Sequence, residues 1–198
     1  MKFSYYDTLA NLILGYLLLF ILMYIIGVEY NEKLTIPYMA AGFVLGYFLN
    51  AISGLLEGFY YWTFGGMPST KLLQHDETKG YAGIDRVRFY ETKRAVQLLK
   101  EECKNQNADE RHIFGVAMRF AGALKDTRIP TFNEQYVFSR VMLTFVIIST
   151  VLIIVKFPCC WITYATTIPT LLLAWNRCRE RGYYFAKEVL KEYLNCKK

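Results

Sequence analysis

Residues 34–56 read LTIPYMAAGFVLGYFLNAISGLL and contain no Asp, Glu, Lys or Arg. An α-helix rises about 1.5 Å per residue, so this run is long enough to cross a hydrocarbon core about 30 Å thick. A second uncharged run of similar length lies upstream, at residues 8–28. Two such runs in 198 residues are atypical of a soluble core, so the sequence predicts membrane-spanning helices.

Two shorter uncharged runs follow, at residues 141–155 and 157–176, with Lys156 between them. The first run is short for a span unless Arg140 and Lys156 reach opposite interfaces with their long alkyl stems. A tight turn around Lys156 would join the two helices. We therefore expect an all-α polytopic membrane protein with four transmembrane helices and a small helical cytosolic module.

The intervening segment and the tail carry amphipathic helical patterns. Apolar residues recur at helical spacing in residues 88–104 and 111–125. The segment is too small for a roomy core of its own, so we expect it to pack on the membrane helices or on neighbouring copies. The tail is expected to lie against the membrane surface. The expected division is a transmembrane hairpin at 1–63 (spans at about 8–28 and 34–62), a helical cytosolic module at 64–130, a second transmembrane hairpin at 131–176 and a basic amphipathic tail helix at 177–198.

The placement of charge predicts the orientation in the membrane. The chain is 54% hydrophobic and 20% charged, with a formal net charge of +6, so apolar and charged residues must be segregated. Of its 23 Lys and Arg residues, only Lys33 and Lys156 fall in the two short loops on one side. The positive-inside rule then places both termini and the module in the cytosol, in a bacterial inner membrane.

Catalytic and metal-binding patterns are not visible in the sequence. The two histidines are isolated, the five cysteines form no CxxC pair and there is no Walker loop. We therefore expect no enzymatic activity, no cofactor and no metal site. A lipid-modifying enzyme that uses Glu57 is a weaker hypothesis, because a single carboxylate lacks the second base, metal or nucleophile that such chemistry needs.

The second span carries small residues every four positions, which form a stripe along one side of a helix. Small residues allow close approach of another backbone in lipid. The stripe is interpreted either as packing within one subunit or as a subunit interface or pore wall. A polar ridge beside it, at helical spacing, favours a cavity or a partner. The candidate residues for helix packing or a pore are Gly42, Gly46, Asn50, Ser53, Gly54 and Glu57.

Basic residues of the central segment form a second candidate site. Their charges and hydrogen-bond donors suit phosphates of a nucleotide or nucleic acid, or an acidic partner. The alternative is a solvated helical surface or a contact with anionic lipid headgroups, since the segment also contains many acidic residues. The candidate ligand- or partner-binding residues are Arg86, Arg88, Lys93, Arg94, Arg111, Arg119, Lys125 and Arg128.

The chain contains four short motifs that are informative in combination. They are YYDTL at residues 5–9, GYFLNAIS at 46–53, GGMPS at 65–69 and FNEQYVFSR at 132–140. Together they resemble small four-span membrane proteins of bacterial anti-phage defence loci. Similarity to the membrane effector of the Hailong system implies an oligomeric channel, favouring a tetramer, that is controlled by a nucleic-acid ligand. Similarity to the membrane subunit of the Kiwa system implies a membrane sensor that holds a DNA-binding partner.

These observations lead to two hypotheses about function. The first is a homo-oligomeric inner-membrane effector, in contact with lipid, that acts as a channel or disrupts the membrane. Its basic module would be gated by a nucleotide, a nucleic acid or a protein signal. The alternative is a non-conducting sensor or scaffold that holds a cytosolic DNA-binding defence partner at the membrane.

Overall fold

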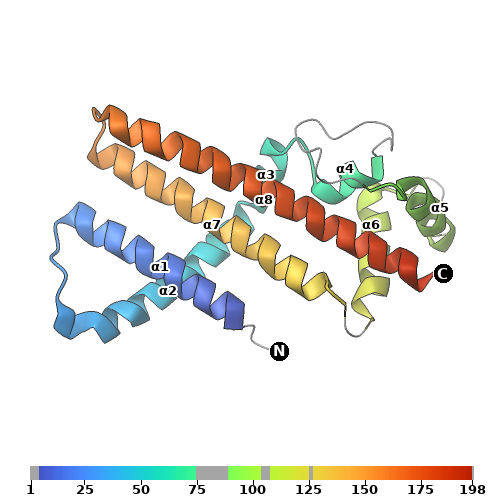
Figure 1. Ribbon diagram of the computed structural model, residues 1–198, viewed down its shortest axis with the longest axis horizontal. Coiled ribbons are helices and arrows are strands. Elements are labelled where there is room, and N and C mark those ends of the chain that lie inside the picture. Colours follow the sequence, from blue (N-terminus) through green and yellow to red (C-terminus); the bar gives the residue numbers. More distant parts are fainter. Residues whose placement is uncertain (1–4, 75–88, 104–107, 125–126, 198) are drawn as a thin grey trace. The chain divides into compact units, whose positions relative to one another are not determined.

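The computed structural model describes residues 5–74, 89–103, 108–124 and 127–197 (Figure 1). All regular structure within these ranges is helical, and they contain no strand. The predicted all-α class is therefore confirmed. The elements are α1 (Tyr5–Ile26), the 3-10 helix η1 (Glu32–Leu34), α2 (Thr35–Leu55), α3 (Glu57–Thr63), α4 (Pro68–Gln74), α5 (Thr92–Glu102), α6 (Glu110–Gly122), α7 (Ile129–Lys156) and α8 (Trp161–Cys196).

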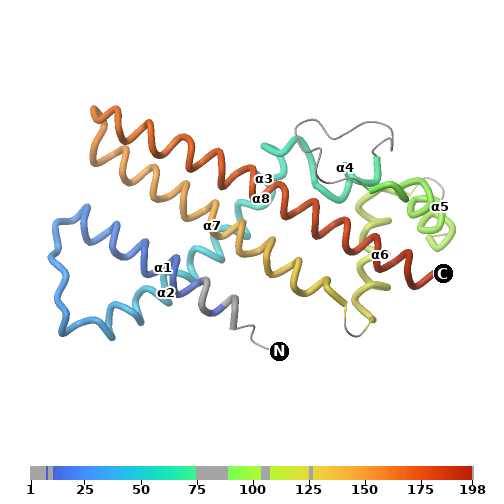
Figure 2. Tube along the Cα trace, viewed as in Figure 1, coloured from blue at the N-terminus to red at the C-terminus, as the bar shows by residue number. Residues whose placement is uncertain are grey.

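The chain divides into two compact units, each built from segments that are far apart in the sequence. Unit 1 comprises Met1–Gly58 and Val137–Cys178, and unit 2 comprises Phe59–Tyr136 and Arg179–Lys198. Helices α7 and α8 are each unbroken, as the trace in Figure 2 shows. Both contribute residues to both units.

Unit 1 is built from two helical hairpins. Helices α1 and α2 are joined through η1, whose first turn is capped by the Asn31 side chain, because Asn31 Oδ1 accepts a hydrogen bond from the Lys33 amide at 3.0 Å. Helices α7 and α8 are joined by the short turn at residues 157–160. The Lys156 ammonium donates to the Ile25 carbonyl at 3.0 Å, so the end of α7 is tied to the end of α1. The long lysine stem thus delivers its charge to a polar group at the end of the helix.

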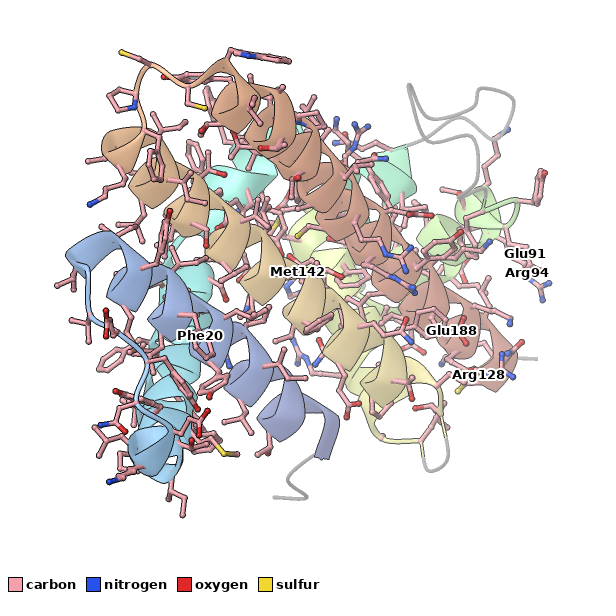
Figure 3. All side chains as sticks on the ribbon, turned by 60° about the vertical axis from the view of Figure 1, so that its left-hand side comes forward. Phe20, Glu91, Arg94, Arg128, Met142 and Glu188 are labelled. Atoms are coloured by element: carbon pink, nitrogen blue, oxygen red, sulfur yellow. The ribbon has the colours of Figure 1, made fainter. Side chains whose placement is uncertain are left out.

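The core of unit 1 draws on three helices. Leu14 and Leu18 of α1 pack with Leu49 of α2 and Val141 of α7, all of them buried. The outer side of the same helices is also apolar: Figure 3 shows Phe20 on α1 and Met142 on α7, which are 36% and 41% exposed. Other large apolar side chains with at least half of their surface exposed in unit 1 are Ile13, Tyr24, Ile26, Val28, Ile36, Val44, Phe48, Leu55, Val151, Val155, Trp161, Ile162, Ile168, Leu172 and Leu173.

Two helical stretches of the described chain are long and apolar enough to cross a membrane. They are Glu32–Leu55 and Ile129–Lys156, and a shorter apolar helical stretch covers Asn11–Ile26. Helix α8 begins with an apolar section that also contains several threonines and Pro169.

The expected single helix over residues 34–62 is interrupted. Helix α2 ends at Leu55 and α3 begins at Glu57, with Leu56 between them at φ −81° and ψ −2°. Gly54 and Gly58 flank this point, and glycine destabilises a helix interior by roughly 0.5–1 kcal/mol relative to alanine, so a break here costs little. The expected helix is therefore two helices.

The end of α3 lies where the paired glycines predict it. Gly65 and Gly66 have φ values of 74° and 132°, which side chains disfavour. The Gly66 amide donates to the Tyr61 carbonyl at 2.8 Å and the Gly65 amide to Trp62 at 3.0 Å. This is the hydrogen-bond pattern of a Schellman cap.

Unit 2 has a hydrophobic core of its own. Leu72 of α4, Leu99 of α5 and Ala117 of α6 are fully buried in it, and so are Leu190 and Tyr193 of α8. Short helices that bury apolar faces against one another gain stability that none has alone. The module is therefore packed around the last turns of α8.

This arrangement corrects the expectation for the tail. The apolar face of residues 179–197 is covered by α4, α5 and α6 and does not lie on a membrane surface. The segment 64–130, which alone is too small for a roomy core, acquires one by including this face.

Candidate functional site

The polar ridge of α2 lies partly inside unit 1. The Ser53 side chain is fully buried, and its hydroxyl donates to the Asn50 carbonyl at 2.8 Å in the same helix. The Asn50 residue is partly buried. Because Ser53 is satisfied by its own helix, its hydroxyl needs no water-filled cavity.

The small-residue stripe has two halves with different surroundings. At Gly42 and Gly46, α2 meets α1 so closely that a Cβ atom on Gly42 would lie 2.8 Å from Tyr16 Cα, and one on Gly46 would lie 3.0 Å from Asn11 Cα. Gly15 is the α1 residue at this crossing. A Cβ atom added to Gly15 would lie 2.8 Å from Gly46 Cα. At Gly54 an added Cβ would meet no atom within 4 Å. The first half of the stripe therefore packs within the chain, and the second half is open.

Glu57 and Arg140 form an ion pair inside unit 1. Glu57 Oε1 lies 2.9 Å from Arg140 Nη1, and their side chains are 33% and 13% exposed. Such charge-assisted bonds are roughly twice as strong as neutral ones, and partial burial reduces screening by salt. The pair links the first turn of α3 to the middle of α7.

Glu57 is among the site residues predicted from the sequence, and Arg140 is not. A signal was present: Glu57 follows the second span and Arg140 precedes the third, so both lie at the same interface of the predicted topology. Opposite charges at equal depth are expected to pair.

Further polar side chains are buried in unit 1 close to these residues in sequence. Thr144 is fully buried and donates to the Arg140 carbonyl at 3.0 Å. Ser149 is 7% exposed, and its hydroxyl has no hydrogen-bond partner among the described residues. Thr144 and Ser149 are thus polar side chains in the interior of unit 1.

The basic candidates that the structure describes lie on two helices of unit 2 and at the residue before α7. Lys93 and Arg94 are exposed at the start of α5, and Arg94 Nη1 lies 3.8 Å from Glu91 Oε1 in the same turn (Figure 3). Arg111 and Arg119 are exposed on α6, and Arg128 is exposed just before α7. The remaining three candidates, Arg86, Arg88 and Lys125, lie outside the described residues.

The described ranges contain no group of three or more His, Cys, Asp or Glu side chains placed to hold a metal ion. Comparisons of the chain with protein-family models, with curated proteins and with solved structures give no match. Two groups of residues form the candidate site: the Glu57–Arg140 pair with its buried polar neighbours, and the exposed basic residues of unit 2.

Proposed function

We propose that the protein is a homo-oligomeric effector of the bacterial inner membrane whose cytosolic unit 2 receives a signal and whose unit 1 then opens an ion path. The observation that carries this proposal is the large exposed apolar surface of unit 1. Polar side chains such as Asn11 and Thr144 are buried, whereas Ile36 and Leu55 are 81% and 85% exposed. Lipid is the solvent in which such a surface is stable. The resemblance to anti-phage defence proteins supplies the biological setting.

In this proposal all four apolar segments of unit 1 cross the bilayer. The apolar part of α1 is short, but the Lys156 ammonium on the Ile25 carbonyl places a charge at its end, which suits an interface. In α8, the hydroxyls of Thr167 and Thr170 donate to carbonyls four residues earlier, each at 2.7 Å. Threonines satisfied in this way are tolerated in a span around a proline.

The proposed route of the signal is the pair of long helices. Because α7 and α8 carry core residues of unit 2 and continue without a break into unit 1, a ligand that shifts them in unit 2 moves their apolar sections too. The Glu57–Arg140 pair fastens α3 to α7 and would act as the latch of the closed state. Opening would separate the pair and expose Glu57 together with Asn50 to the path.

The open half of the glycine stripe supports assembly from several copies. Gly54 and Gly58 leave space for any added Cβ, and small residues on a lipid-facing helix are where another helix packs most closely. A path lined by Asn50 and Glu57 would then be formed by several subunits, with a ring of carboxylates that favours cations.

Planar-bilayer recording of the purified protein tests the proposal. Current is expected when an oligonucleotide or a nucleoside triphosphate is added on the side of unit 2. Arg140→Gln should raise the current without ligand by releasing the latch, and Glu57→Gln should in addition reduce cation preference. Glu32→Gln, which removes an exposed carboxylate of η1, is the matched control and should change neither. Silence of all variants under every ligand would exclude conduction.

The second candidate is the non-conducting scaffold. The observation that favours it is the packing of the ridge in the single chain, where Ser53 is fully buried and Glu57 is paired. Exposed Lys93, Arg94 and Arg111 would then hold an acidic or DNA-binding partner. Loss of a copurified partner on charge reversal at these positions, with no current at any time, would favour this function over the channel.

A further inference from the structure

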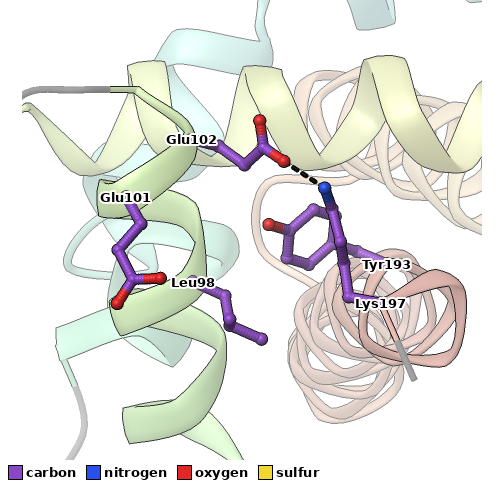
Figure 4. A pocket seen from close by; sticks show the side chains of 5 residues that line it. All are labelled: Leu98, Glu101, Glu102, Tyr193 and Lys197. Carbon is purple, nitrogen blue, oxygen red and sulfur yellow. Dashed lines mark hydrogen bonds and ion pairs between the residues drawn. The ribbon is translucent and has the colours of Figure 1, made fainter.

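A pocket of about 360 Å³ lies within unit 2, between α5 and the end of α8 (Figure 4). Small-molecule sites in proteins begin at roughly this size. Leu98, Glu101 and Glu102 of α5 and Tyr193 and Lys197 of α8 line it.

The charges of this pocket select a cation. Two carboxylates and one ammonium group line it, which leaves a net negative charge. The Lys197 ammonium forms an ion pair with Glu102 and lies 4.9 Å from the centre of the Phe120 ring. Glu101 accepts a hydrogen bond from Gln97 Nε2 at 3.4 Å, a long and therefore weak bond. An alkylammonium group is thus already accommodated here by a carboxylate and an aromatic face.

The Tyr193 hydroxyl is a second, independent feature of this pocket. The residue is fully buried, and its hydroxyl has no hydrogen-bond partner among the described residues. In Figure 4 this hydroxyl points toward the α5 side of the pocket. Burial, together with the nearby Glu102 carboxylate, raises the pKa of Tyr193 to about 12, so the hydroxyl is neutral at physiological pH. A buried hydroxyl without a partner is costly, and a ligand N–H would satisfy its oxygen.

We propose that this pocket binds a small aliphatic primary ammonium ion, such as a diamine, for which Lys197 is the internal competitor. The ligand ammonium would pair with Glu101 and Glu102 and donate to Tyr193 Oη, and its alkyl stem would lie on Leu98. Lys197 is held in the last turn by one backbone bond, from its amide to the Leu194 carbonyl at 3.2 Å. Its side chain can therefore leave the pocket without disturbing the buried core.

Calorimetric titration of the full chain in lipid nanodiscs with 1,5-diaminopentane tests the proposal. Binding is expected for the wild type, and Lys197→Met should tighten it about tenfold by removing the competitor. Glu101→Gln should weaken it about tenfold, and Tyr193→Phe, which keeps the ring, should weaken it less. Glu91→Gln removes the carboxylate of the residue just before α5, which pairs with Arg94 outside the pocket, and should have no effect.

Three outcomes would overturn the proposal. The first is no heat with wild type and Lys197→Met alike, in samples whose thermal unfolding is unchanged. The second is equal weakening by Glu91→Gln and Glu101→Gln, which would indicate general attraction of cations to the surface. The third is binding of a penta-lysine peptide that 1,5-diaminopentane fails to displace, which would assign the pocket to a protein side chain. Neutral 1,5-pentanediol should not bind.

Discussion

Gly15 has no side chain, which allows α1 to approach α2 closely. A Cβ atom there would lie 2.8 Å from Gly46 Cα, which is shorter than any stable contact between carbon atoms. The close approach supplies van der Waals contact between the two helices, and such contact is the main source of helix association where the surroundings are lipid.

Gly15→Ala and Gly46→Ala are therefore expected to destabilise the folded chain by about 1–3 kcal/mol each, because the helices must separate. Gly54→Ala is the matched control, since its added methyl group meets no atom within 4 Å. Thermal unfolding in detergent measures the difference. Equal melting temperatures for the three variants would mean that the crossing is not close.

The reactivity of the Cys160 thiol should depend on pH. The backbone N–H of Thr163, then its hydroxyl and the Ile162 N–H, lower the pKa of this exposed thiol in the turn before α8. A lowered pKa keeps more thiolate at slightly acidic pH, and the thiolate is the reactive form. In a chain that retains Cys160 alone, Thr163→Val should raise the pKa and slow maleimide labelling at acidic pH. A rate independent of this substitution would contradict the hydrogen bond.

The Glu57–Arg140 ion pair connects α3 to α7. Its side chains are partly exposed, so its contribution should lie between the values for surface and buried pairs, at about 1–2 kcal/mol. Glu57→Gln and Arg140→Gln should each lower the free energy of unfolding. The double variant should lose less unfolding free energy than the sum of the two single losses. A double-mutant cycle by thermal unfolding measures this coupling. A coupling of zero would mean that the pair is not formed in the bilayer.

The last turns of α8 are a second structural element whose role can be measured. Leu190 is fully buried among α4, α5 and α6, so Leu190→Ala should cost about 2–5 kcal/mol and loosen unit 2 as a whole. Lys191→Ala changes the exposed neighbour and should be nearly neutral. Protease digestion of the two variants distinguishes them. Equal resistance would imply that α8 does not form the core of unit 2.

The sequence alone predicts most of the helices but not their partners. Helical periodicity and uncharged runs predicted the segments that form α1, α2 and α5 to α8, and Gly65–Gly66 predicted the end of α3, because these are local properties. The short helix α4 was not predicted. The break at Leu56 was not predicted, since it depends on a small balance of helix propensities between two glycines. The partner of the tail was not predicted either. An amphipathic pattern shows that Leu190 needs an apolar surface and does not show which one.

The candidate site was predictable to a lesser degree for the same reason. Asn50, Ser53 and Glu57 share one side of a helix by spacing alone. Pairing of Glu57 with Arg140 joins positions far apart in the chain, and only the packing of α2 and α3 on α7 brings them together. The fully buried Ser53 follows from that packing too.

The two longest helices connect the two units of the chain. Helix α7 begins in unit 2 and helix α8 ends there, and both have apolar sections in unit 1. If unit 1 lies in the membrane, the turn at residues 157–160 must face one side and the end of α8 the other. Both positions carry exposed cysteines, so the chain already contains the labels for a test.

Labelling with a membrane-impermeant maleimide in spheroplasts is the most direct test of this claim. Two versions of the chain are needed, one that retains only Cys160 and one that retains only Cys196. We expect Cys160 to react in intact spheroplasts and Cys196 to react only after lysis. Reaction of Cys196 in intact spheroplasts, or release of the protein from membranes by carbonate washing, would show that this topology is wrong.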